Sequence, residues 1–250
     1  MAIIALLTDF GTRDPYVAAM KGVIAGRCDA RIEDLSHEIA PFDVFGAAWF
    51  LRSVVEFWPA GTIFVVVVDP GVGTARRILA AVHEERTFLA PDNGVLSLAV
   101  APPAVSVETE SFFLPHGSTT FHGRDRFAPV AAAIANGIPL SDLGPSVDDI
   151  VRLDYTPPSY GDARVDGTIV AVDHFGNLIT DVEASKIAFD PVLRAGWHVV
   201  DRVERSYGEA KESPFLIAGS TGCFELSVAN GSAADVLQLS RGEKVSITPK

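Results

Sequence analysis

The amino-acid sequence predicts an α/β protein of two domains: an N-terminal parallel-rich α/β sandwich and a smaller, C-terminal β-rich domain of barrel-like form. Segments typical of strands and helices alternate through the first half of the chain, which favours a parallel sheet covered by helices. After about residue 160 the chain changes to short strand-like segments with little helix. With 250 residues, 48% of them hydrophobic, the chain is long enough to bury a core in each domain.

The first half has the pattern β-α-β-α-β, followed by a hairpin and two further helices. The first helix has Pro15 in its first turn, where a missing N–H group removes no hydrogen bond. The strand before Asp69 is a continuous apolar run, as expected of a strand buried on both faces. The expected elements are a strand at 3–7, a helix from 15 to about 26, a strand at 31–36, a helix at 44–58, a strand at 62–68, a hairpin of strands 78–83 and 87–90 around Glu84, Glu85 and Arg86, a short helix opened by Asn93 and Gly94, and a helix at 126–136.

Proline, glycine and small polar residues concentrate in DYTPPSYGDA, residues 154–163, which is typical of a linker. We therefore expect an N-terminal domain at 1–155, a linker at 156–163 and a C-terminal domain at 164–250. The expected elements of the second domain are strands at 164–173, 177–182, 197–205, 215–218, 223–228 and 244–248, and one helix at 233–239.

Composition argues against several classes of function. The formal net charge is −12 and the isoelectric point is about 4.8, with no run of Lys or Arg, which disfavours a nucleic-acid partner. Cys28 and Cys223 form no CxxC pair, which argues against a disulfide scaffold and a cysteine zinc site. The low cysteine content fits the reducing interior of a cell. The opening MAIIALL lacks a basic segment, so we interpret it as a strand rather than an export signal. Since no stretch reaches the roughly 20 apolar residues of a membrane span, we expect a cytoplasmic protein with no membrane partner.

The stretch VVVVDPGVGTARR, residues 65–77, joins a buried strand to an acid, two glycines and two arginines. Gly71 and Gly73 suggest a nucleotide-binding loop, but the position of the third glycine of a dinucleotide fingerprint is occupied by Arg76. A Walker loop fails as well, because neither Lys-Ser nor Lys-Thr follows Gly73. What remains is a loop at a strand end whose glycines permit tight geometry and which presents Asp69 and Arg76 at its mouth.

Four further stretches carry reactive or polar groups, and each has a structural alternative. In LTDFGTRDPY, Asp9 ends the first strand, where open α/β sheets place ligand-binding groups, and Asp14 follows five positions on; Asp9 could equally cap its turn. In TTFHGRDRFAP, His122 precedes a helix start, where a lone histidine is more often structural. VDHFGNLITD, which contains Asp173, also fits a strand-turn-strand with Gly176 at the bend. GSTGCFELSVANGSAA could be loop sequence alone.

Together and in this order, the motifs resemble the family of S-adenosyl-L-methionine (SAM) hydroxide adenosyltransferases, formerly a domain of unknown function, whose relatives include fluorinases and chlorinases. The resemblance extends over essentially the whole chain. It rests on TDFGTRDPYV, HEIAPFDV, VVDPGVGTARR, APDNGVLS, FHGRDRFAP, DHFGNLITD and the segment from GS to NGSAA.

The resemblance implies hydrolysis of SAM, in which water attacks the 5′ carbon of the ribose and expels methionine, leaving adenosine. By the family's motifs, Asp69, Arg76 and His122 form the triad that handles water. The halide-using branch departs from this triad, so its presence here favours water as the nucleophile. The resemblance also implies a small-molecule substrate, no cofactor, and a homotrimer with each site between the first domain of one subunit and the second domain of its neighbour.

Further residues match positions at which the family binds its substrate. By this resemblance Asp9 holds the ribose hydroxyls, while Phe42 and Phe121 form walls around the sugar and the sulfonium. Asp173 matches a position near the methionine amino group. The other expected contacts are Asp14 in the first motif, Phe175 and Asn177 toward adenine, Tyr207 as an aromatic that stacks on adenine, Ser220 and Thr221 at methionine-binding positions, and Glu225, Val228 and Asn230 along the edge of the adenine.

Elementary chemistry agrees with this assignment. A thioether that leaves a sulfonium departs neutral, so no acid has to protonate it. Full deprotonation of water, with a pKa of about 15.7, by an ordinary carboxylate with a pKa of about 4 would cost roughly 16 kcal/mol. As the C–O bond forms, however, the attacking water becomes a strong acid, so Asp69 can accept its proton late or orient it. Because arginine stays protonated, we expect Arg76 to pair with Asp69, while His122 supplies another hydrogen bond.

Three other functions stay open on the sequence alone. A SAM-dependent halogenase would use a chloride or fluoride nucleophile in the same site. A non-catalytic protein could bind adenosine or SAM without converting it. A metal-dependent hydrolase could use Asp9, Asp69, His122 and Asp173, but no HxxxH or paired-histidine spacing supports it, and we expect no metal.

Overall fold

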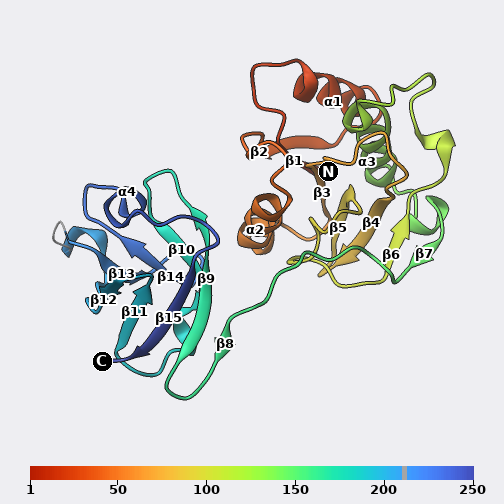
Figure 1. Ribbon diagram of the computed structural model, residues 1–250. Coiled ribbons are helices and arrows are strands. Elements are labelled where there is room, and N and C mark those ends of the chain that lie inside the picture. Colours follow the sequence, from red (N-terminus) through yellow and green to blue (C-terminus); the bar gives the residue numbers. More distant parts are fainter. Residues whose placement is uncertain (210–212) are drawn as a thin grey trace. The chain divides into compact units, whose positions relative to one another are not determined.

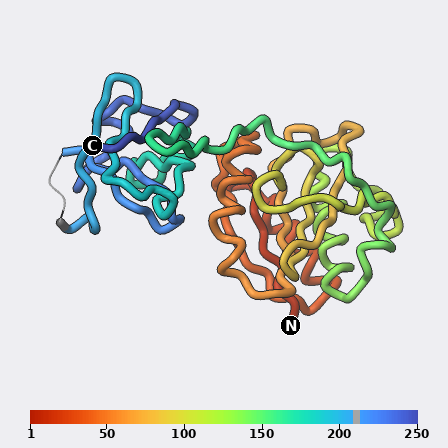
Figure 2. The backbone as a smooth tube through the Cα atoms, turned by 90° about the horizontal axis from the view of Figure 1, so that it is seen from below, coloured from red at the N-terminus to blue at the C-terminus, as the bar shows by residue number. Residues whose placement is uncertain are grey.

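The computed structural model describes residues 1–209 and 213–250 and divides into two compact units, Met1–Asp154 and Tyr155–Lys250. Each unit has its own sheet and its own hydrophobic core (Figure 1). The chain passes from one unit to the other near residue 155, as the backbone trace shows (Figure 2). The predicted fold class, an α/β domain followed by a smaller β-rich domain, is confirmed.

The sheet of the N-terminal unit has the strand order β2-β1-β3-β5-β4-β6-β7 within the described residues. The first four strands in this order run parallel to one another, whereas β4 pairs with β5 and β6, and β6 with β7, in antiparallel fashion. The strand bounds are β1 Ile3–Thr8, β2 Arg31–Ser36, β3 Thr62–Val67, β4 Ile78–His83, β5 Arg86–Pro91, β6 Ala104–Ser106 and β7 Ser146–Val147.

Helices cover both faces of this sheet. Alternate side chains of β1 and β3 pack on one face against α1 (Tyr16–Ala25) and α3 (Ala128–Ala135), and the intervening side chains pack on the other face against α2 (Val44–Val54). All six residues of β3 are buried, as the continuous apolar run predicts. The carboxylate of Asp43 starts α2 by accepting a 2.9 Å hydrogen bond from the backbone N–H of Gly46.

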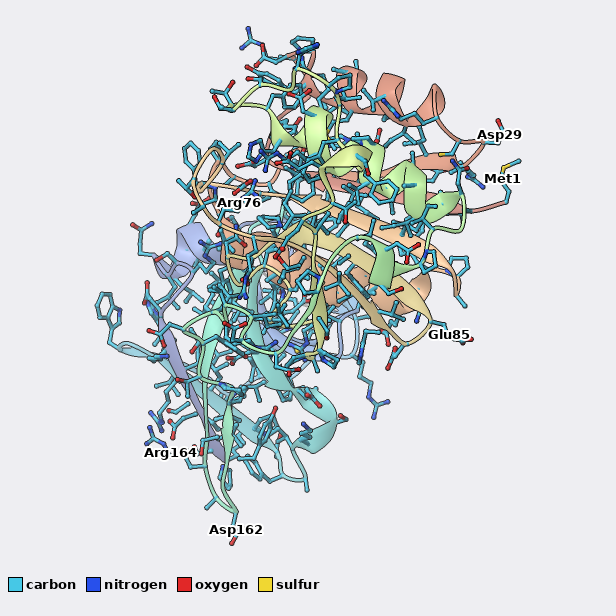
Figure 3. The ribbon with its side chains drawn as sticks, turned by 90° about the vertical axis from the view of Figure 1, so that its right-hand side faces the viewer. Met1, Asp29, Arg76, Glu85, Asp162 and Arg164 are labelled. Atoms are coloured by element: carbon cyan, nitrogen blue, oxygen red, sulfur yellow. The ribbon has the colours of Figure 1, made fainter. Side chains whose placement is uncertain are left out.

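The order of the strands creates an open edge at the carboxyl ends of β1 and β3. The chain leaves β1 toward β2 on one side, while β3 lies on the other side of β1, and ligands of open α/β sheets bind where connections diverge in this way. Thr8 is in register with Val67, so the residues that follow both strands emerge at the same edge. In Figure 3, Arg76 lies at this end of the unit, whereas Met1, Asp29 and Glu85 lie at the opposite end.

Two predictions for the N-terminal unit need correction. Asn93 and Gly94 open a series of turns rather than a helix, because the Asn93 side chain is held by the Val68 carbonyl at 2.8 Å and by the Val95 N–H at 3.1 Å. The β4–β5 loop contains only Glu84 and Glu85, with φ of 46° and 60°, and Arg86 already belongs to β5. The predicted helix at 126–136 is α3, preceded by a π-helical turn, and the predicted helix at 44–58 ends as a 3₁₀ turn.

The C-terminal unit is an antiparallel sheet that curves, barrel-like, around a core of its own (Figure 1). Its main order is β12-β11-β15-β9-β10-β14-β13, and β8 pairs with β9 beside this path. The bounds are β8 Ser159–Tyr160, β9 Val165–Val172, β10 Leu178–Glu183, β11 Pro191–Ala195, β12 His198–Val200, β13 Phe215–Ala218, β14 Cys223–Ser227, β15 Lys244–Pro249 and α4 Ala233–Leu237. The short helical turns among the described residues of both units are Val55–Phe57, Glu110–Phe112, Gly123–Phe127, Leu140–Asp142, Ala184–Lys186 and Tyr207–Glu209.

The predicted strand at 197–205 is wrong in extent. The chain forms a hairpin of β11 and β12 around Gly196, whose φ is +57°, so only His198–Val200 of the predicted strand pairs in it. β11 was not expected because it begins at Pro191, although proline is tolerated at the first position of a strand. Within the expected linker, Ser159–Tyr160 forms the short strand β8. No helix of the described residues has the length and apolar character required to cross a bilayer.

Candidate active site

A cavity of about 440 Å³ lies at the carboxyl edge of the sheet in the N-terminal unit. Five residues singled out in the sequence come together in its wall: Asp9, Phe42, Asp69, Phe121 and His122. The complete lining is Asp9, Phe10, Tyr16, Pro41, Phe42, Val67, Asp69, Val72, Thr120, Phe121, His122 and Gly123. Segments from four separate parts of the chain thus form one concave site.

Asp69 forms a buried, forked ion pair with Arg76. The Arg76 Nε donates to both carboxylate oxygens, at 3.0 Å to Oδ1 and 2.9 Å to Oδ2, and its Nη2 also donates to Oδ2. The side chains are only 5% and 9% exposed, so solvent screens the pair little. Charge-assisted hydrogen bonds from a planar guanidinium fix both the position and the rotation of a carboxylate.

Arg76 also contacts His122, so it lies between the other two members of the triad. Its Nη2 is 2.8 Å from the Nδ1 of His122. A guanidinium can only donate, so Nδ1 must accept, and the imidazole is neutral with its proton on Nε2. Burial lowers the pKa of His122, and the charges of Arg126 and Arg76 lower it further against the opposing effect of Asp69 and Asp125. The hydrogen-bond geometry and the electrostatics therefore agree on a neutral ring.

One nitrogen of Arg76 has no partner among the described residues. The buried Nη1 makes no hydrogen bond with them, although the guanidinium lies 5.6 Å from the ring centre of Phe127. A buried donor without an acceptor costs about 1–3 kcal/mol. Nη1 is covered by protein atoms, and Arg76 itself is not part of the cavity lining.

Gly73 brings the loop of Asp69 and Arg76 against the segment that carries His122. Its φ is +80°, a conformation that favours glycine, and a Cβ atom there would lie 2.8 Å from the carbonyl oxygen of Thr119. Any larger residue would push the two segments apart. The glycines of this loop thus serve close backbone packing rather than the binding of a nucleotide phosphate.

Asp9 holds a strained aromatic residue at the mouth of the cavity. Its Oδ2 accepts a 2.9 Å hydrogen bond from the backbone N–H of Phe42, which has a φ of 66° and a 69% exposed side chain. Such a conformation costs a non-glycine residue about 1–3 kcal/mol. Asp9 thereby links the β1 loop to a distant segment, whereas Asp14 is exposed and lies outside the lining of this cavity.

Two aromatic residues of the cavity were missed in the sequence. Phe10 and Tyr16 pack with Phe121 as a cluster, with ring centres 5.1 to 5.9 Å apart. Both belong to the motif LTDFGTRDPY, so their position beside Asp9 was a usable signal. With Phe42 and Phe121, they give the cavity four aromatic rings, which suit a sugar and a soft cation.

A second cavity, of about 610 Å³, lies in the C-terminal unit. It gathers six of the residues expected to bind substrate: Asp173, Phe175, Asn177, Tyr207, Val228 and Asn230, together with Ala229, Gly231 and Ser232. Ser220 and Thr221 are exposed in the β13–β14 turn and do not line it. Glu225 is buried beneath the cavity and accepts a 2.8 Å hydrogen bond from the hydroxyl of Tyr207.

The β9–β10 turn shapes one side of this second cavity. The Oδ1 of Asp173 accepts from the N–H groups of Phe175 at 2.9 Å and Asn177 at 2.8 Å, and its Oδ2 accepts from the side-chain amide of Asn177 at 2.8 Å. Gly176, with φ of +83°, forms the bend. The strand-turn-strand interpretation of this motif is thus correct, and the turn also presents Phe175 and Asn177 to the cavity.

In the portion of the chain that is described, no cluster of three or more His, Cys, Asp or Glu side chains is suited to hold a metal ion.

Sequence similarity decides the family. A model of the SAM hydroxide adenosyltransferase N-terminal domain matches residues 4–144, and one of the corresponding C-terminal domain matches residues 167–246. The chain belongs to the SAM hydroxide adenosyltransferase family. The resemblance inferred from the motifs is therefore confirmed.

Several known proteins are similar to most or all of this chain. A protein of Thermus thermophilus named (R)-S-adenosyl-L-methionine hydrolase is 36% identical, over 99% of this chain and 100% of its own length. One of the same name from Salinispora tropica is 37% identical, over 98% and 97%. A fluorinase of an Actinoplanes species is 30% identical over 77% of each chain. The crystal structure of an uncharacterized conserved protein from Thermotoga maritima superposes with a TM-score of 0.91 at 33% identity, covering 98% of this chain and 99% of the other.

Proposed function

We propose that this protein hydrolyses SAM to adenosine and L-methionine by in-line attack of water on the ribose C5′, with Asp69, Arg76 and His122 handling the water. The buried arrangement of these three side chains at the edge of an aromatic cavity carries the proposal. Membership of the family and the names of its full-length relatives support the same reaction.

In this mechanism Asp69 orients the water and accepts its proton late. The carboxylate lines the cavity, and the forked pair with Arg76 leaves it no freedom to rotate. Since the leaving thioether is neutral, the site has to organise only the nucleophile and its proton. The carboxylate also balances the charge of Arg76, so that a sulfonium does not face an uncompensated cation.

His122 is proposed to supply a further hydrogen bond to the water, as expected from the sequence. Its Nδ1 is engaged by Arg76, so the protonated Nε2 is the ring nitrogen left to donate a hydrogen bond. We infer that the Nε2–H of His122 donates a hydrogen bond to the water, while Asp69 accepts one from it. A halide ion would need donors alone, and the carboxylate would repel it, so this set favours water.

We further propose that the second cavity binds the nucleoside. Phe175, Tyr207 and Val228 would supply apolar contact, and Asn177 and Asn230 hydrogen bonds, to adenine. Asp173, Ser220 and Thr221 are proposed for the methionine part of the substrate, and Asp9, Asp14, Phe42 and Phe121 for the ribose and the sulfonium. Glu225 is proposed to contribute to the adenine edge through its hydrogen bond to Tyr207.

A homotrimer is part of this proposal, with each site completed by the N-terminal unit of one subunit and the C-terminal unit of its neighbour. The family resemblance supports it, as does the presence in each unit of a cavity with its own predicted residues. Co-expression of Asp69→Ala and Asn177→Ala chains tests it. Mixed oligomers should regain turnover that each variant lacks alone, and an absence of recovery in verified mixed trimers would contradict the shared site.

We also expect a cytoplasmic protein that uses neither metal nor cofactor and binds neither nucleic acid nor membrane. The net charge of −12 and the two cysteines, Cys28 and Cys223, which form no disulfide, support this expectation.

Turnover in water enriched in oxygen-18 tests the reaction itself. Attack at C5′ places the heavy oxygen in adenosine and leaves methionine unlabelled, whereas attack on the methionine side chain would label the amino-acid product instead. Mass spectrometry of both products distinguishes the two. Unlabelled adenosine, or no adenosine after long incubation, would refute the proposal.

A further inference from the structure

Tyr207 lines the second cavity although it belongs to an irregular part of the chain. It begins a short 3₁₀ turn between β12 and β13, and the pairing described nearest before it is the bridge of Val203 with Leu216. The last ladder bond on that side joins the N–H of Glu204 to the carbonyl of Leu216 at 2.9 Å. Backbone pairing described there thus stops short of Tyr207, so side-chain contacts must hold its ring at the cavity.

Glu225 provides such a contact from a rigid position. It lies in β14, is 5% exposed, and is paired on one side with Ile179 of β10 and on the other with Ile217 of β13. Its Oε2 accepts the Tyr207 hydroxyl at 2.8 Å, and the ring of Tyr207 also meets Phe215 edge-on at 6.2 Å. One end of Tyr207 is therefore fixed to the sheet, while its ring borders the cavity.

The fold reserves space for this carboxylate. A Cβ atom at Gly219 would lie 1.7 Å from the Glu225 Oε1, so only a glycine leaves room for the side chain as it stands. Burial raises the pKa of Glu225, and the hydrogen bond from Tyr207 opposes this rise. Burying a carboxyl group costs free energy unless the group is hydrogen-bonded, which argues against a purely space-filling role for Glu225.

We propose that Glu225 is a positioning residue, which fixes the ring of Tyr207 as a wall of the nucleoside cavity by accepting its hydroxyl hydrogen bond. Glu225 then acts through Tyr207 and does not itself touch the base. The identity of the nucleoside as adenosine rests on the proposed function. Holding the ring in place before binding lowers the entropic cost of stacking a base on it.

Adenosine binding by isothermal titration calorimetry, together with KM and kcat for SAM, tests the proposal. Tyr207→Phe keeps the ring but loses the anchor and should weaken adenosine binding about tenfold, with the change expected in KM. Glu225→Ala should do the same, whereas Glu225→Gln keeps an acceptor oxygen and should restore binding to within about threefold of wild type. The double variant Tyr207→Phe, Glu225→Ala should be no weaker than either single variant, because both remove the same bond.

Tyr160→Phe is the matched control. Its hydroxyl accepts a 2.9 Å bond from the N–H of Glu183 in the same unit, away from the cavity lining, so its loss should lower thermal stability without changing the affinity for adenosine. Gly219→Ala displaces the carboxylate without altering Tyr207 and should weaken binding like Glu225→Ala.

The outcomes separate this inference from the proposed function. If wild type hydrolyses SAM but Tyr207→Phe binds adenosine as tightly as wild type, or if the two losses add in the double variant, the positioning role is refuted and the function stands. If wild type releases no adenosine from SAM but the variants weaken adenosine binding as described, the function fails and the positioning role stands. Wild type that does not bind adenosine at all would overturn the positioning role.

Discussion

Replacing Arg76 with lysine separates the geometry of the triad from its charge. Lysine keeps the positive charge beside Asp69 but has a single ammonium group in place of a planar fork. In the structure the fork reaches both oxygens of Asp69 and the Nδ1 of His122. An ammonium that stays near Asp69 cannot reproduce this set.

The expected loss follows from the bonds removed. Lysine at position 76 can keep about one strong contact to Asp69, so about two charge-assisted hydrogen bonds disappear, each worth about 1.5–3 kcal/mol. The side chains are 9% and 5% exposed, so the discount that applies to surface ion pairs is small here. A total of about 3–6 kcal/mol in the transition state corresponds to a fall in kcat of about 10²- to 10⁴-fold.

The assay is chromatographic measurement of adenosine formed from saturating SAM. Arg77→Lys is the control, because the neighbouring Arg77 makes comparable bonds to Asp92 and Asp149 outside the cavity lining. The control should lose thermal stability and keep kcat within about twofold. If Arg76→Lys also keeps kcat within about fivefold of wild type, its geometry contributes less than about 1 kcal/mol and the reasoning fails.

Three further predictions concern pH, metal and the ribose. Burial and the charges of Arg126 and Arg76 lower the pKa of His122 below its usual 6.5, so the neutral ring persists at pH 7. The kcat should therefore fall only below about pH 6.5. This fall should be absent from the pH profile of His122→Asn. The unfolded chain takes up that proton more readily, so the contribution of His122 to stability also decreases as the pH falls through this range; thermal unfolding against pH measures it, and a rise would contradict the sign. Dialysis against a strong chelator should leave turnover unchanged, whereas a loss restored by a divalent metal would show that a metal takes part. Asp9→Asn removes the charge but keeps an acceptor for Phe42, and should weaken adenosine binding about tenfold by calorimetry; an unaltered Kd would exclude Asp9 from ribose binding.

Local patterns in the sequence predicted most of the regular structure. Apolar runs and alternation located β1, β2 and β3, and the position after each strand pointed to Asp9 and Asp69 as neighbours at one edge. The pairing of Arg76 with Asp69 was also predictable, because the two belong to one short loop and have opposite charges.

Contacts between distant segments were harder to foresee. Nothing in the sequence places His122 against Arg76 rather than against the water, since the contact depends on how closely two loops pack. Glu225 was expected at the adenine edge from the resemblance to the family, and its hydrogen bond to the distant Tyr207 was not foreseen. The short helix expected after Asn93 is absent, because the side chain of Asn93 bonds to the carbonyl of Val68 after a different strand, a contact that the local sequence does not reveal.

The close approach at Gly73 has a consequence for how this site can change. At the Cα of Gly73, only a hydrogen atom fits between the loop of Asp69 and Arg76 and the segment that carries His122. The backbone therefore sets the spacing of these three groups. Residues 69, 76 and 122 can then be exchanged for other side chains without moving their attachment points. A redesign that seeks a different nucleophile should vary those three positions and leave Gly73 alone, since even a methyl group there would shift all of them at once.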